Sequence, residues 1–91
     1  MSSRTYDNIT PAIWACVKET SNQEHGTTYT GPDQGTATTQ IPIVGTLVMS
    51  YDFQASAGTL TYAIVKKPGL APESRIWGGI ESTIDGCRSS A

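Results

Sequence analysis

The sequence has few of the charged and apolar residues that usually dominate a globular protein. Of its 91 residues, 15% are charged and 37% are hydrophobic, against averages of about 25% and about 45–50%. The chain has six basic and eight acidic residues, which gives a net charge of −2. Neutralising nucleic-acid phosphates requires clustered lysine and arginine, and Lys66-Lys67 is the only close pair. We therefore expect no nucleic-acid binding.

Long apolar runs are missing as well. No stretch approaches the roughly 18 consecutive apolar residues of a membrane span, so we expect a small soluble domain without membrane contact. Residues 1–8 lack the apolar centre of a secretory signal. These absences favour a cytoplasmic protein. Export by a route without a signal peptide, or trimming from a longer precursor, remain alternatives.

The sequence carries no recognisable catalytic or metal-binding motif. Paired-cysteine and paired-histidine metal spacings, glycine-rich phosphate loops and the nucleophile elbow are all absent. We expect no metal and no cofactor, and we assign no catalytic residue. A small enzyme that uses His25 with Cys16 or a nearby glutamate is an alternative. On a helix, however, His25 and Cys16 would lie more than two turns apart, which favours a solvated histidine at a helix end.

The two cysteines, Cys16 and Cys87, leave two interpretations open. In a reducing compartment both are free and mostly buried thiols, and we favour this interpretation for a cytoplasmic protein. In an exported protein they would form a disulfide that closes most of the chain and constrains the unfolded state. A secreted effector, toxin or inhibitor would fit the second interpretation.

The clearest pattern in the sequence is an alternation of apolar and polar residues between about 45 and 66. It predicts a central hairpin whose apolar side chains share one face. A loop at 54–57 would place Phe53 opposite Gly58 and Tyr51 opposite Leu60. The buried face would then carry Leu47, Met49, Tyr51, Phe53, Leu60, Tyr62 and Ile64.

Two segments outside the hairpin have helical spacing. Thr10-Pro11 is typical of a helix start, and Gly26 of a stop, which predicts a helix at about 11–24. A strand over 12–18 is the competing interpretation. Isoleucines every fourth residue predict a C-terminal helix at about 73–85, which Gly86 would end.

These elements predict an α+β fold within a single domain, 1–91. We expect a small antiparallel sheet of three to five short strands, covered by the two helices, with residues 1–8 and 88–91 as loose tails. An all-β sandwich is the alternative. The Thr- and Gly-rich segment 26–40 is either a mobile loop or a pair of edge strands. The expected core comprises Ile13, Val17, Leu47, Met49, Tyr51, Leu60, Tyr62, Ile64, Ile76, Ile80 and Ile84.

The two helical segments resemble one another. Residues 12–20 and 75–83 each carry Ile-Trp, two small residues, a β-branched residue and, three positions later, threonine. The match is too short for a solenoid repeat. It is either a coincidence or a sign that both segments pack in the same way against one sheet.

Aromatic residues are the best candidates for a binding surface. Helical geometry places Trp14 and Trp77 at the flanks of their apolar stripes, where each could seal the core, join a second copy or stack on a sugar. Tyr29 and His25 lie in or next to the polar 26–40 segment. The sequence thus favours a non-enzymatic binding or interaction module, possible partners being a protein, a second copy, or a small polar ligand such as a sugar.

Overall fold

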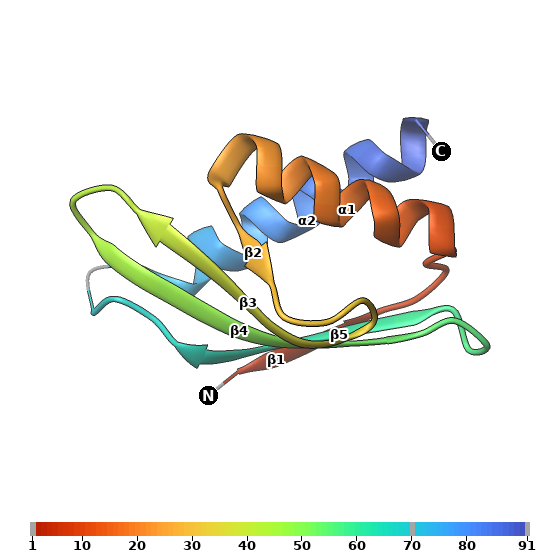
Figure 1. Cartoon of the computed structure of the whole chain (residues 1–91), viewed down its shortest axis with the longest axis horizontal. Helices are drawn as coiled ribbons and strands as arrows, with labels where there is room; N and C mark the ends of the chain where they lie inside the picture. Colours follow the sequence, from red (N-terminus) through yellow and green to blue (C-terminus); the bar gives the residue numbers. More distant parts are fainter. Residues whose placement is uncertain (1, 70, 91) are drawn as a thin grey trace.

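The chain forms a five-stranded antiparallel sheet with both helices on one face (Figure 1). The computed structural model describes residues 2–69 and 71–90. The sheet order is β1-β5-β4-β3-β2. The predicted α+β class is therefore confirmed, and the all-β alternative is wrong. In chain order the elements are β1 (Ser3–Tyr6), α1 (Pro11–His25), β2 (Thr28–Tyr29), β3 (Gln34–Ile41), β4 (Gly45–Gln54), β5 (Thr59–Lys66) and α2 (Glu73–Ser90).

The central hairpin β4–β5 forms where the alternation predicted it, but its register is shifted by two residues. Phe53 pairs with Leu60 instead of Gly58. The turn closes one residue later than expected because Gly58 takes a left-handed backbone conformation (φ 68°) and donates to the Gln54 carbonyl at 2.8 Å. Side chains alternate between faces along a strand, so a shift of two residues keeps the apolar set together.

The first helix begins and ends as its capping residues predict. The Thr10 hydroxyl accepts a hydrogen bond from the Ile13 amide at 3.1 Å, and Pro11 occupies the first helical position. Gly26 ends the helix with a left-handed conformation (φ 67°) that residues with a side chain adopt at a steric cost.

The second helix is longer than predicted. It begins at Glu73 as expected but continues to Ser90 instead of ending near 85. Gly86 does not stop it because the next residue, Cys87, is buried and bonded to α1. Arg88 also donates a hydrogen bond to the Asp7 carbonyl. The expected loose tail at 88–91 is thus wrong for 88–90, and Ala91 lies outside the described residues.

Within the loose tail that we expected at 1–8, residues 3–6 form a strand instead. β1 pairs antiparallel with β5 and so occupies what would otherwise be an open sheet edge. Side chains hold it against α2: Arg4 forms an ion pair with Glu81 at 2.5 Å, and the Tyr6 hydroxyl donates to the same carboxylate at 3.0 Å. Met1 lies outside the described residues.

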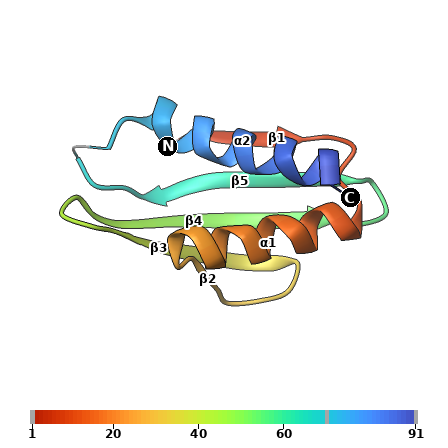
Figure 2. The same cartoon turned by 90° about the horizontal axis from the view of Figure 1, so that it is seen from above.

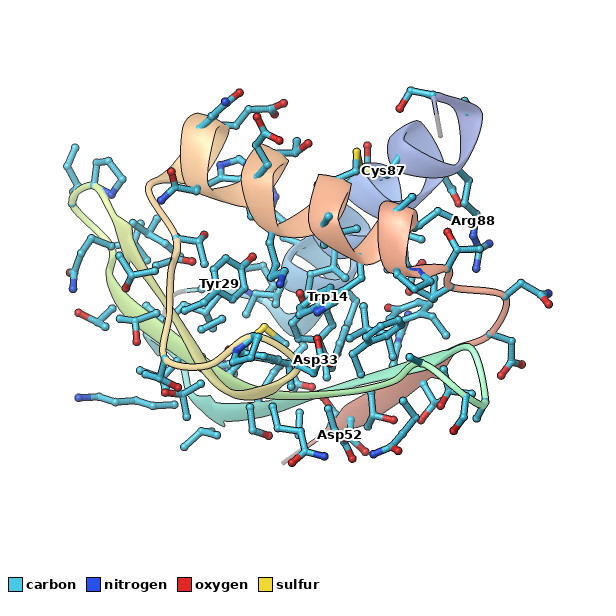
Figure 3. The ribbon with its side chains drawn as sticks, turned by 45° about the vertical axis from the view of Figure 1, so that its right-hand side comes forward. Trp14, Tyr29, Asp33, Asp52, Cys87 and Arg88 are labelled. Carbon is cyan, nitrogen blue, oxygen red and sulfur yellow. A yellow bond between two sulfur atoms is a disulfide. The ribbon has the colours of Figure 1, made fainter. Side chains whose placement is uncertain are left out.

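The core lies between the helices and the apolar face of the sheet. All residues of the predicted core are buried except Ile80, which is half-buried. Six further residues belong to it: Ile9, Trp14, Ala37, Phe53, Trp77 and Cys87. The opposite face of the sheet is polar, and Asp52 projects from it away from the helices (Figure 3).

Cys16 and Cys87 form a disulfide, which corrects our preference for two free thiols. Their Cα atoms lie 5.8 Å apart although 71 residues separate them in the sequence. The fold brings them together because α1 and α2 cross the same face of the sheet side by side (Figure 2). Within the described residues, neither helix has the length and apolar character needed to cross a membrane.

Replacing both cysteines, Cys16→Ser with Cys87→Ser, is expected to lower the free energy of unfolding by about 4 kcal/mol, because the unfolded chain loses a cross-link around a very long loop. Urea unfolding of the oxidised protein and the double variant measures the difference. As a control, reductant should destabilise the native sequence by the same amount and leave the double variant unchanged. A loss below about 1 kcal/mol would contradict the expectation.

Candidate functional site

The two helices are joined near one end and diverge toward the other. The disulfide links the first half of α1 to the last turns of α2. Toward the end of α1 and the start of α2 the helices separate (Figure 2). Between them, above the sheet, lies a cleft of about 600 Å³. Sites for small molecules typically have volumes of about 300–1,000 Å³.

Apolar side chains form the floor and one side of the cleft. Leu47 and Met49 rise from β4, Ile41 comes from β3, and Ile76 and Ile80 project from α2. Protein cores are normally packed without voids larger than a water molecule. An opening of this size over core residues therefore leaves apolar surface that a ligand can cover.

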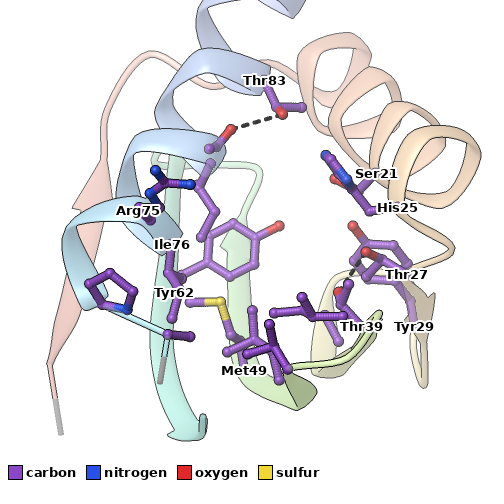
Figure 4. Close-up of a pocket in the computed structure, with 18 residues that line it drawn as sticks. Ser21, His25, Thr27, Tyr29, Thr39, Met49, Tyr62, Arg75, Ile76 and Thr83 are labelled. Carbon is purple, nitrogen blue, oxygen red and sulfur yellow. Dashed lines mark hydrogen bonds between the residues drawn. The ribbon is translucent and has the colours of Figure 1, made fainter. Parts of the chain in front are cut away.

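The side of the cleft formed by α1, β2 and β3 is polar (Figure 4). Ser21 and His25 come from the last turns of α1, and Thr39 from β3. The hydroxyl groups of Tyr29 and Tyr62 point toward one another across the interior (Figure 4). The cleft thus offers an apolar bed together with a small set of hydrogen-bonding groups, the combination that orients ligands in binding sites.

Hydrogen bonds fix the polar side in place without any ligand. The Thr27 and Thr39 hydroxyls are 2.7 Å apart, and Asn22 Nδ2 donates to the Thr27 carbonyl at 3.0 Å. On α2 the Thr83 hydroxyl donates to the Gly79 carbonyl at 3.0 Å. These bonds restrict the side chains before binding, which reduces the entropy that a ligand must offset.

Burial raises the pKa of the Tyr62 hydroxyl well above its ordinary range, and the neighbouring Tyr29 adds to the increase. Burial likewise raises the pKa of Tyr29. Both phenols are therefore neutral at physiological pH. Each can donate one hydrogen bond to a ligand and accept another, and neither supplies a negative charge.

The cleft contains two of the four residues that the sequence suggested for binding. Tyr29 and His25 both line it. Trp14 and Trp77 do not, because each is only 2% exposed in the core. We expected both tryptophans at the edge of an apolar stripe, but both are fully packed. Neither indole face is therefore open to a ligand or a second copy.

Each tryptophan has a structural role instead. Trp14 lies between α1 and the sheet, among the rings of four other aromatic residues (Figure 3). Its indole NH donates to the Pro32 carbonyl at 2.9 Å, which ties the segment before β3 to the core. The Trp77 indole donates to the Ser2 hydroxyl at 3.1 Å, and the Arg4 guanidinium lies 5.2 Å from its ring centroid.

The surroundings of His25 provide little for catalysis. Cys16 is bonded to Cys87 and has no free thiol to act as a nucleophile. Among the described residues that line the cleft there is no carboxylate to orient or activate the imidazole. Within the same described ranges, no three His, Cys, Asp or Glu side chains are grouped for metal binding.

Sequence reasoning missed most of the cleft. The alternation in β4 and β5 identified Met49 and Tyr62 as inward-facing but gave no sign that the core above them is incompletely filled. Arg75 and Thr39 carried no recognisable signal. The one available signal was Gly79, a glycine in the middle of a helix. Because it has no side chain, it leaves space at a position that lines the cleft.

Comparisons of the chain with protein-family models, with curated proteins and with solved structures gave no match.

The raised tyrosine pKa values predict a loss of stability at alkaline pH. The folded protein holds the Tyr62 proton more tightly than the unfolded chain does, so the stabilisation is complete below the ordinary tyrosine pKa of about 10 and is lost as the pH rises above it. In that range Tyr62 should contribute a slope of about −1.4 kcal/mol per pH unit. Tyr6, whose pKa burial and Glu81 raise to about 12, should add to the slope.

Urea unfolding at several pH values between about 8 and 11 measures this dependence. Tyr62→Phe cannot ionise at this position, so its free energy of unfolding should fall less steeply than that of the native sequence. Comparing both proteins at neutral pH separates any packing effect of the substitution from the titration. Equal slopes for the two proteins above pH 10 would show that Tyr62 titrates normally.

Proposed function

We propose that the protein is a non-enzymatic binding module that holds a small, mostly apolar molecule with a polar group in the cleft between α1 and α2. The observation that carries this proposal is the cleft of about 600 Å³, whose floor includes the core residues Leu47 and Met49. A domain this small has little apolar area to spare for stability. Leaving part of it uncovered is understandable if a ligand covers it.

The character of the lining argues for an apolar ligand over a sugar. Sugars are typically held by an exposed aromatic face together with many hydrogen bonds. Here both tryptophans are buried, and aliphatic side chains such as Ile76 and Ile80 dominate one side of the cleft. The few polar groups on the other side suit a single polar substituent on the ligand.

Self-association through the tryptophans, part of our sequence-based expectation, is weakened by the burial of both indoles. A protein partner remains a competing occupant of the cleft. A concave site with an apolar floor and one polar side favours a small molecule, and for this reason we place the small ligand first.

The disulfide supports a second proposal, which concerns the setting in which the module works. Disulfides persist in oxidising compartments and are rare in the cytosol. We infer that the protein acts outside the reducing cytosol, as an exported binding protein or effector. Counting free thiols in protein taken from its native source under denaturing, non-reducing conditions tests this. Two free thiols per chain would overturn it.

The sharpest test of the cleft fills it from the helix backbone. Gly79 lines the cleft, its neighbour Gly78 does not, and a Cβ atom at either position meets no atom within 4 Å. Gly79→Leu should therefore reduce the affinity for a neutral apolar dye such as N-phenylnaphthylamine by about tenfold or more, because an isobutyl group occupies the site. Gly78→Leu is the matched control and should bind the dye as the native protein does.

Fluorescence titration measures the dye affinity. Both substitutions raise helix propensity by up to about 1 kcal/mol, so a loss of binding in Gly79→Leu alone is not explained by unfolding, which circular dichroism can verify. If the two variants bind the dye equally well, the dye is not in the cleft and the proposal loses its support.

A further inference from the structure

Two basic side chains line the cleft, and the described residues that line it include no carboxylate. His25 enters from α1 and Arg75 from the first turn of α2 (Figure 4). No aspartate or glutamate is among the described lining residues, although acidic residues outnumber basic ones in the whole chain and its net charge is −2. The local sign of charge at the cleft is therefore opposite to that of the protein as a whole.

Among the described residues, no carboxylate forms an ion pair with Arg75. In the described part of the chain the only ion pair joins Arg4 to Glu81, and the nearby Glu73 carboxylate accepts a hydrogen bond from the Ser2 hydroxyl. The Arg75 side chain is exposed at the rim of the cleft, beside the apolar Ile76. A cationic group without a partner, next to apolar surface, favours a ligand that is itself amphipathic.

We propose that the natural ligand is an organic monocarboxylate, with an apolar body that lies against Met49 and Ile76 and a carboxylate that pairs with Arg75. This inference rests on the proposed function and specifies its ligand. A single guanidinium presents two parallel N–H groups that match one carboxylate. A phosphate would carry more charge and more acceptor oxygens than one arginine and the neutral hydroxyls of the cleft can satisfy.

Two matched probes test the charge: decanoate and decanol, which have the same chain length and differ in their head group. Calorimetric titration of the oxidised protein at low ionic strength, with decanoate below its micelle concentration, should show decanoate binding about tenfold more tightly than decanol. Arg75→Gln should remove this preference while retaining decanol binding. Arg75→Lys keeps the charge without the forked geometry and should retain part of it.

Lys66→Gln is the matched control for net charge, because Lys66 is exposed and does not line the cleft. It should leave the preference for decanoate intact. Equal affinity of the native protein for the two probes would overturn the carboxylate inference and leave the proposed function standing. If Lys66→Gln and Arg75→Gln lost the preference for decanoate equally, the carboxylate inference would also be overturned. If neither probe binds, the carboxylate inference is overturned. If the dye also fails to bind, or binds equally well to Gly79→Leu and Gly78→Leu, the proposed function itself fails.

Discussion

The covalent bond between Cys16 and Cys87 sets the geometry on which the rest of the molecule depends. Both helices pack on the same face of the sheet, and the bond ties the first half of α1 to the last turns of α2. Beyond that place the helices diverge (Figure 2). One end of the sheet is therefore closely covered and the other is left partly open, because two straight rods that are joined near one end and inclined to each other must leave a gap at the other.

The burial of the core side chains differs between the joined end and the open end. At the joined end Ile9, Leu60 and Ile84 are 0–1% exposed, which corresponds to the dense packing of a normal core. At the open end Ile41 and Ile80 are only partly buried, because they pack against the core on one side and line the cleft on the other. The stabilising cross-link thus compensates for a core that is incomplete where the ligand would bind. Small domains often need such a covalent contribution, because they bury too little apolar area to depend on packing alone.

Sequence reasoning recovered the parts of the fold that depend on local patterns. The alternation in β4 and β5 and the caps of α1 each have a local physical cause, and these elements were placed correctly. One error is local, the hairpin register, which depends on the left-handed conformation of Gly58. The other errors concern partners that are far apart in the sequence. Nothing within residues 1–8 shows that the edge of β5 is available for pairing, and nothing near Gly86 shows that Cys87 reaches Cys16. The cleft was missed for the same reason, since a void between elements depends on the angle between two helices.

The short similarity between residues 12–20 and 75–83 now has a physical interpretation. In both segments the Ile-Trp pair is buried, in agreement with the idea that both pack alike on one face of the sheet. The segments differ two positions after the tryptophan, where the first has Cys16 and the second has Gly79. Cys16 draws α1 onto α2 and closes one end, whereas Gly79 has no side chain and leaves the other end open. At equivalent positions of the two segments, Cys16 therefore joins the helices and Gly79 leaves space for a ligand.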